Sequence, residues 1–196
     1  MPRLVLASAS PRRRALLAQL GYRVELRPSA IHERRFDGES PMQLVRRLAR
    51  EKAQSVIRPR EKALVLAADT LVCLGDQVFG KPADADEALA FYQTLGGQWH
   101  QVLTAVAIHD GKDLHQILSR SSVFLRALDA AEARAYWATG EPRDKAGGYA
   151  IQGIGAVFIT GLRGSYSGVM GLPLAETAAL LTRLGFPPPS LRGRHE

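Results

Sequence analysis

The sequence has little of several features, and each shortage excludes a class of protein. Its 196 residues include a single cysteine, Cys73, so an intrachain disulfide is excluded and a reducing compartment is favoured. No apolar run approaches the roughly 20 residues that a membrane helix needs. The apolar residues 1–10 are too few for a signal peptide and lead directly into a basic segment. These shortages predict a cytoplasmic protein that does not cross a membrane.

Lysine is also scarce, because arginine supplies 21 of the 26 basic residues. The net charge is +7, and it is placed unevenly: residues 1–60 hold 14 basic and 5 acidic side chains, whereas the remainder is slightly acidic. Such a bias favours a polyanionic partner, such as a nucleotide or a nucleic acid. The alternative is a chain that simply prefers arginine on its solvated surfaces, and the total charge does not decide between them.

The composition is otherwise that of a globular protein, with 46% hydrophobic and 23% charged residues, and the length fits one domain. Apolar runs, alternating patterns and Gly or Pro punctuation alternate along the chain, which predicts a mixed α/β class. Strands are expected at residues 4–7, 23–27, 63–68, 99–109, 114–128 and 156–160, with a hairpin over 71–79. Helices are expected at residues 11–20, 41–57, 84–95, 129–139 and 174–184. The proline-rich tail, residues 187–196, is expected to fray.

The first helix opens in a way that favours an anion. Ser10 is a good N-cap and Pro11 a good first residue, yet the first turn carries Arg12 and Arg13, which oppose the helix dipole. A bound polyphosphate would resolve this conflict, with the hydroxyls of Ser8 and Ser10 and the backbone N–H groups as further donors. The alternative is a solvated basic turn without a ligand.

Acidic residues and scarce lysines supply the other candidates. Asp69 follows an apolar run, so we expect it at the end of a strand, where it could hold a divalent metal or take a proton from water. Glu33, in a polar loop, is a second candidate metal ligand. Where arginine is the default, a lysine suggests a need for a compact ammonium, which makes Lys52, Lys81 and Lys145 candidate ligands. The alternative for Asp69 is a residue that only caps a turn.

Residues 139–153 form a loop rich in glycine and charge. Glycine allows the backbone to approach a ligand closely, and the Gln152 amide can both donate to and accept from a base edge. A purely structural turn is the alternative. The loop around residues 164–168 is a further candidate. The five histidines lack the spacing of a metal site, and Cys73 is interpreted as a core residue.

Five segments together resemble the Maf family of nucleoside triphosphate pyrophosphatases. They occur in the order typical of that family and span nearly the whole chain: residues 6–13, 50–53, 68–70 with 80–82, 144–153, and 164–166 with 171–174. The resemblance implies an elongated α/β fold like that of the inosine-triphosphate pyrophosphatases, a single domain over residues 1–186 with two lobes around a deep cleft. It also implies a homodimer.

The resemblance also implies an activity and a site. The expected reaction is hydrolysis of a nucleoside triphosphate to the monophosphate and pyrophosphate with Mg²⁺ or Mn²⁺. Asp69 is then the catalytic base, and Glu33 together with Asp69 forms the metal side. The implied phosphate ligands are Ser10, Arg13, Lys52 and Lys81.

Three positions bear on the base that is recognised. Arg12, Thr70 and Gln152 match the branch of the family that acts on dTTP and UTP, rather than the branch for 7-methyl-GTP. A neutral amide at Gln152 can pair with the donor-and-acceptor edge of uracil or thymine. The run 167–170 departs from the family pattern, since Gly168 lacks a side-chain amide. The alternatives are 7-methyl-GTP, a broader range that includes CTP, or a nucleic-acid-binding regulator of septum formation.

Overall fold

The computed structural model describes residues 3–191 and confirms the mixed α/β class. A seven-stranded sheet forms its centre, with the order β2-β1-β3-β5-β6-β7 and with β4 paired to β3. The strands are β1 (Arg3–Leu6), β2 (Val24–Leu26), β3 (Ala63–Leu74), β4 (Gln77–Phe79), β5 (Gln98–His109), β6 (Leu114–Leu125) and β7 (Ile159–Arg163). β1 pairs in parallel with β2 and with β3, and the remaining strand pairs are antiparallel.

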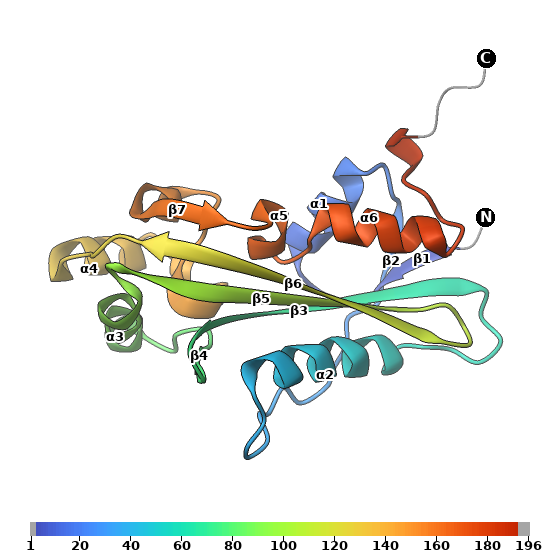
Figure 1. Cartoon of the computed structure of the whole chain (residues 1–196), viewed down its shortest axis with the longest axis horizontal. Helices are drawn as coiled ribbons and strands as arrows, with labels where there is room; N and C mark the ends of the chain where they lie inside the picture. Colours follow the sequence, from blue (N-terminus) through green and yellow to red (C-terminus); the bar gives the residue numbers. More distant parts are fainter. Residues whose placement is uncertain (1–2, 192–196) are drawn as a thin grey trace.

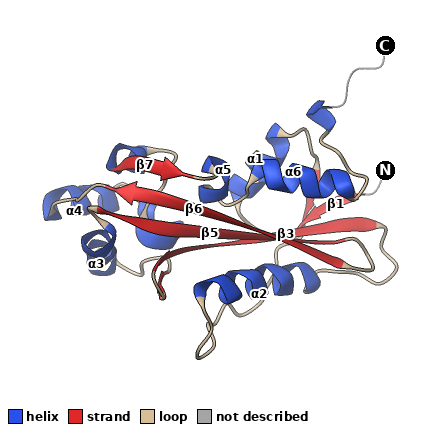
Figure 2. Ribbon diagram, viewed as in Figure 1, coloured by secondary structure: helices blue, strands red, loops and turns tan. Residues whose placement is uncertain are grey.

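Six α-helices surround this sheet, and Figure 1 shows an elongated molecule with helices on both faces. They are α1 (Pro11–Gln19), α2 (Pro41–Gln54), α3 (Ala85–Leu95), α4 (Ala130–Ala138), α5 (Tyr166–Val169) and α6 (Leu174–Arg183). Figure 2 shows α2 below the sheet, and α1 with α6 above it. Short 3₁₀ turns cover Glu141–Asp144, Ala146–Gly148, Ile154–Phe158 and Pro189–Leu191. No helix within residues 3–191 has the length and apolar character needed to span a bilayer.

The apolar run that opens β3 is explained by burial on both faces of the sheet. Successive side chains of a strand point to opposite faces, so Leu64 and Leu66 contact the layer of α1 and α6, whereas Val65 and Ala67 contact α2. A third cluster forms at the other end of the sheet, where α3 and α4 pack on β5 and β6. The core is therefore divided between two ends of one long sheet.

Several predicted boundaries differ from the structure, and the strand expected over 114–128 ends at Leu125. Residues 156–158 are a 3₁₀ turn, and the strand begins only at Ile159 and continues to Arg163. The second helix ends at Gln54, not at residue 57. In the part of the predicted tail that the structure describes, Pro188 is buried and the Ser190 N–H donates to the Leu20 carbonyl at 3.2 Å. Residues 192–196 of the predicted tail lie outside the described residues.

Candidate active site

The site lies where the edge of β3 is open. Residues 63–66 of β3 pair with β1, and residues 72–74 pair with β4. Between them, residues 67–71 pair with β5 on one side and with no described strand on the other. Asp69 and Thr70 lie in this stretch, so the prediction that Asp69 ends a strand is wrong: it lies in the middle of β3. Because β1 stops at Leu6, its carboxyl end and the start of α1 face the exposed edge.

A cavity of about 420 Å³ occupies this position. Eleven of the residues that the sequence singled out for substrate or metal line it: Ser8, Ser10, Arg12, Arg13, Glu33, Lys52, Asp69, Thr70, Lys81, Lys145 and Gln152. They come from α1, α2, β3 and the loops that follow β1, β2, β4 and α4. The cavity is therefore built from both ends of the sheet, with charged groups on several sides.

The start of α1 has the predicted cap. The Ser10 hydroxyl accepts from the Arg13 N–H at 3.4 Å, Pro11 is the first residue of the helix, and the first turn contains no acidic side chain. The Ser8 hydroxyl in turn accepts from the Ser10 N–H at 3.2 Å. This turn therefore presents its positive end to the cavity together with two hydroxyl groups.

Arg13 is oriented by neutral oxygens alone. Its guanidinium donates to the Gly171 carbonyl at 3.0 Å, to the Ser8 hydroxyl at 3.2 Å and to the Thr70 hydroxyl at 3.3 Å. No carboxylate among residues 3–191 forms an ion pair with it. Burial lowers the pKa of Arg13, and the more distant carboxylates of Asp69 and Glu33 oppose that effect. A guanidinium stays protonated in a protein, so the cavity contains a fixed positive charge that is not neutralised by contact.

Lys52 lies between the two candidate metal ligands. Its Nζ is 2.6 Å from Asp69 Oδ1 and 2.7 Å from Glu33 Oε1. Asp69 is only 4% exposed, and its Oδ2 has no hydrogen-bond partner in the described part of the chain. Burial raises the pKa of Asp69, whereas the nearby ammonium of Lys52 and guanidinium of Arg13 oppose this. One carboxylate oxygen is thus buried without a hydrogen-bond partner in the described part of the chain.

This pair of carboxylates fits a hard divalent cation. Both contact the same ammonium, so they converge on one point, and Asp69 Oδ2 offers an unused oxygen. Within residues 3–191 there is no cluster of three or more His, Cys, Asp or Glu side chains that would enclose a metal by itself. Mg²⁺ is commonly held by one or two carboxylates while substrate phosphates and water complete its shell, and this donor set matches that pattern.

The far wall of the cavity is the loop after α4. Arg12 forms an ion pair with Asp144 at 3.1 Å, and Lys145 Nζ donates to Asp144 Oδ1 and to the Glu141 carbonyl, both at 2.7 Å. The loop turns through Gly147 with φ of +71°, and a Cβ there would lie 3.0 Å from a methyl group of Val72, so glycine is required. The ion pair between Arg12 and Asp144 therefore joins α1 to this loop, and both residues line the cavity.

A family model described as Maf-like protein matches residues 3–184 of this chain. The chain belongs to the Maf family. It is 54% identical over 193 residues to an Anaeromyxobacter dehalogenans protein named dTTP/UTP pyrophosphatase, a match that covers 96% of this chain and 97% of the relative. A Pseudoalteromonas atlantica protein of the same name is 48% identical over 185 residues, covering 92% and 96%.

A solved structure, that of the Staphylococcus aureus Ham1 protein, is similar over 64% of this Maf chain and 72% of its own, with 12% identity and a TM-score of 0.45.

Sequence reasoning about this Maf chain missed several residues of the cavity. Asp144 connects Arg12 with Lys145, and the Gly171 carbonyl holds Arg13. Asp144 lies within the 144–153 segment of the family resemblance, but nothing in that segment predicts a contact with α1. The 164–168 loop, in contrast, does not line the cavity; its Ser165 caps α5.

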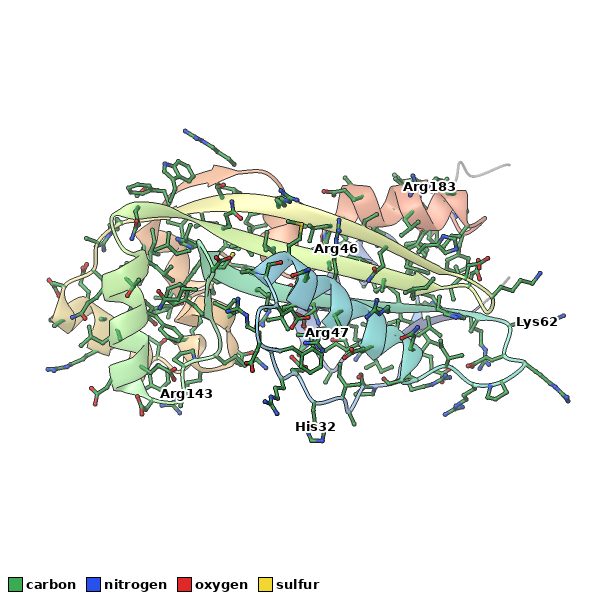
Figure 3. All side chains as sticks on the ribbon, turned by 60° about the horizontal axis from the view of Figure 1, so that its bottom comes forward. His32, Arg46, Arg47, Lys62, Arg143 and Arg183 are labelled. Carbon is green, nitrogen blue, oxygen red and sulfur yellow. The ribbon has the colours of Figure 1, made fainter. Side chains whose placement is uncertain are left out.

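Some of the arginines in the first 60 residues form ion pairs within the molecule. Arg27 contacts both Glu25 and Glu61, and Arg47 contacts both Glu39 and Glu51. Figure 3 shows Lys62 near one end of the molecule and Arg143 near the other. Part of the positive charge of the first 60 residues is therefore paired with carboxylates of the same molecule.

Proposed function

We propose that this Maf protein hydrolyses dTTP and UTP to the nucleoside monophosphate and pyrophosphate. The observation that carries the proposal is the cavity in which the uncompensated Arg13, the cap of α1 and the buried Asp69 converge. The names of relatives at about half identity support the same reaction and substrates. The reaction belongs in the cytoplasm, where nucleotides are made and where the free thiol of Cys73 persists.

The triphosphate tail is assigned to the start of α1. Arg13 supplies a charged fork, and the hydroxyls of Ser8 and Ser10 supply donors beside it. Lys81 and Lys145 line the same cavity and bring further positive charge. These groups neutralise the departing pyrophosphate and hold the tail so that the α-phosphorus faces β3.

Asp69 is assigned to the attacking water. Water donates a proton to the free Oδ2 and attacks the α-phosphorus, while the bond from that phosphorus to the bridging oxygen breaks and pyrophosphate leaves. The raised pKa of Asp69 makes it a better proton acceptor than an exposed aspartate. Bound Mg²⁺ or Mn²⁺, held by Asp69 and Glu33, would neutralise charge on the phosphate oxygens.

The base is assigned to the wall of the cavity formed by residues 149–152. Gln152 is exposed and lines the cavity without a hydrogen bond to any other described residue, so its amide is free to pair with a ligand. An amide complements the alternating donor and acceptor edge of uracil or thymine. Arg12 and Thr70 complete the selectivity positions.

Pyrophosphate release from separate dTTP, UTP, CTP and 7-methyl-GTP, each with Mg²⁺ and with Mn²⁺, tests this proposal. We expect dTTP and UTP to be the best substrates, and Asp69→Asn to lose at least a thousandfold in kcat while its circular dichroism stays unchanged. Faster turnover of 7-methyl-GTP would overturn the assigned specificity. Pyrophosphate release by Asp69→Asn at the wild-type rate would overturn the role of the carboxylate.

A further inference from the structure

A buried threonine behind the cavity contacts one of its walls. Thr104 lies in the middle of β5, opposite Thr70 of β3, and is 1% exposed. Its hydroxyl lies 2.7 Å from the Gly168 carbonyl and 3.1 Å from the Thr70 hydroxyl. Thr104 itself does not line the cavity. Neither its sequence context nor the proposed reaction gives it a role.

The chemistry of these contacts fixes their direction. A hydroxyl has one proton, and a carbonyl oxygen only accepts, so the Thr104 proton goes to Gly168. The Thr70 hydroxyl must then donate to Thr104, which leaves the Thr70 oxygen as the acceptor for Arg13 at 3.3 Å. The result is one directed chain from Arg13 through Thr70 and Thr104 to the Gly168 carbonyl.

The segment that contains Gly168 also binds the Arg13 guanidinium directly. Arg13 Nε donates to the Gly171 carbonyl at 3.0 Å, three residues beyond the carbonyl that ends the chain. Two routes therefore connect Arg13 to residues 168–171, one direct and one through the two threonines. Without Thr104, the Thr70 hydroxyl would lose its acceptor and could rotate away from the guanidinium.

We propose that Thr104 is a positioning residue that orients Arg13 for the triphosphate tail by fixing the proton of Thr70. This inference rests on the proposed function for the identity of the ligand. Because the chain ends on a neutral carbonyl, it orients Arg13 without reducing its charge. Loss of the Thr104 hydroxyl should therefore weaken binding of the phosphates more than it slows the chemical step.

Thr104→Val removes the hydroxyl and keeps the shape of the side chain, and Thr104→Ser restores the hydroxyl. Thr177→Val is a matched control, because Thr177 of α6 is 0% exposed and its hydroxyl has no hydrogen-bond partner among the described residues. With dTTP or UTP, we expect Thr104→Val to raise KM about fivefold to tenfold, the effect of one hydrogen bond, with kcat within twofold. We expect Thr104→Ser and Thr177→Val to stay within twofold of wild type in both constants.

The inference is overturned if Thr104→Val retains the wild-type KM, if Thr104→Ser fails to restore it, or if Thr177→Val raises it equally. Should Thr104→Val not fold, as judged by circular dichroism, Thr104→Ala is measured against the same controls. Calorimetric binding of inorganic pyrophosphate separates this inference from the proposed function, because it needs no turnover. If wild type releases no pyrophosphate from any triphosphate, the proposed function fails, while a fivefold weaker pyrophosphate affinity in Thr104→Val still supports the positioning role.

Discussion

His100 is expected to make the stability of the protein depend on pH, because its imidazole is buried. This histidine of β5 is 2% exposed, and its Nε2 lies 2.6 Å from the hydroxyl of Tyr149, which lines the cavity. Burial lowers the pKa of His100 from 6.5 to about 4, and the backbone of Gln98 opposes this only in part. The folded protein therefore keeps this imidazole neutral where the unfolded chain would protonate it.

The direction and the size of the pH effect on stability follow from the difference in the pKa of His100 between the folded and unfolded states. Above pH 6.5 neither state protonates His100, so its contribution to stability is fully present. As the pH falls from 6.5 towards 4, only the unfolded chain gains the proton, and the free energy of unfolding decreases. One pKa unit corresponds to about 1.4 kcal/mol, so the loss attributable to His100 over this range is about 3 kcal/mol.

Urea unfolding of wild type and His100→Gln at several pH values between 7 and 4 measures this effect. Glutamine retains a polar contact to Tyr149 and does not titrate, so the variant should lose about 3 kcal/mol less than wild type over the range. His32→Gln, which changes an exposed histidine, should follow wild type (Figure 3). If the free energy of unfolding of wild type and of His100→Gln changed equally with pH, the role assigned to His100 would be refuted.

Two further predictions concern the cavity. Lys52→Met removes the ammonium from between Asp69 and Glu33, so nucleotide-free protein should bind Mn²⁺ at least tenfold more tightly by electron paramagnetic resonance. Lys81→Met, which removes a cavity lysine that forms no ion pair with a described residue, should leave that affinity unchanged, and equal effects of both variants would contradict the assignment. Gln152→Glu should lower kcat/KM for UTP at least tenfold, since a carboxylate cannot donate to the base; an unchanged value would exclude Gln152 from base recognition.

Much of the site was visible in the sequence because it depends on local chemistry. The cap at Ser10, Pro11 after it and the arginines in the first turn are short-range features, and the structure confirms the helix that they predict. The position of Asp69 was missed for a different reason. The strand continues through Asp69 and Thr70 because β5 pairs with both, and that partner lies more than 30 residues away in the sequence.

Long-range pairing also explains the other misses. Nothing local in the segment around Asp144 indicates an ion pair with Arg12, which is 132 residues away. In the sequence Thr104 is one polar residue in an apolar strand. Only its pairing with Thr70 in the sheet connects it to Arg13. The residues that line the cavity can thus be found from motifs, whereas the contacts that orient them depend on the assembled sheet.

The central claim is that water is directed onto the α-phosphorus, with pyrophosphate as the leaving group. Hydrolysis of UTP in H₂¹⁸O, followed by mass spectrometry of both products, tests it most directly. Attack on the α-phosphorus predicts one ¹⁸O atom in UMP and none in pyrophosphate. Label in pyrophosphate, with unlabelled UMP, would place the attack on the β-phosphorus and contradict the assigned geometry.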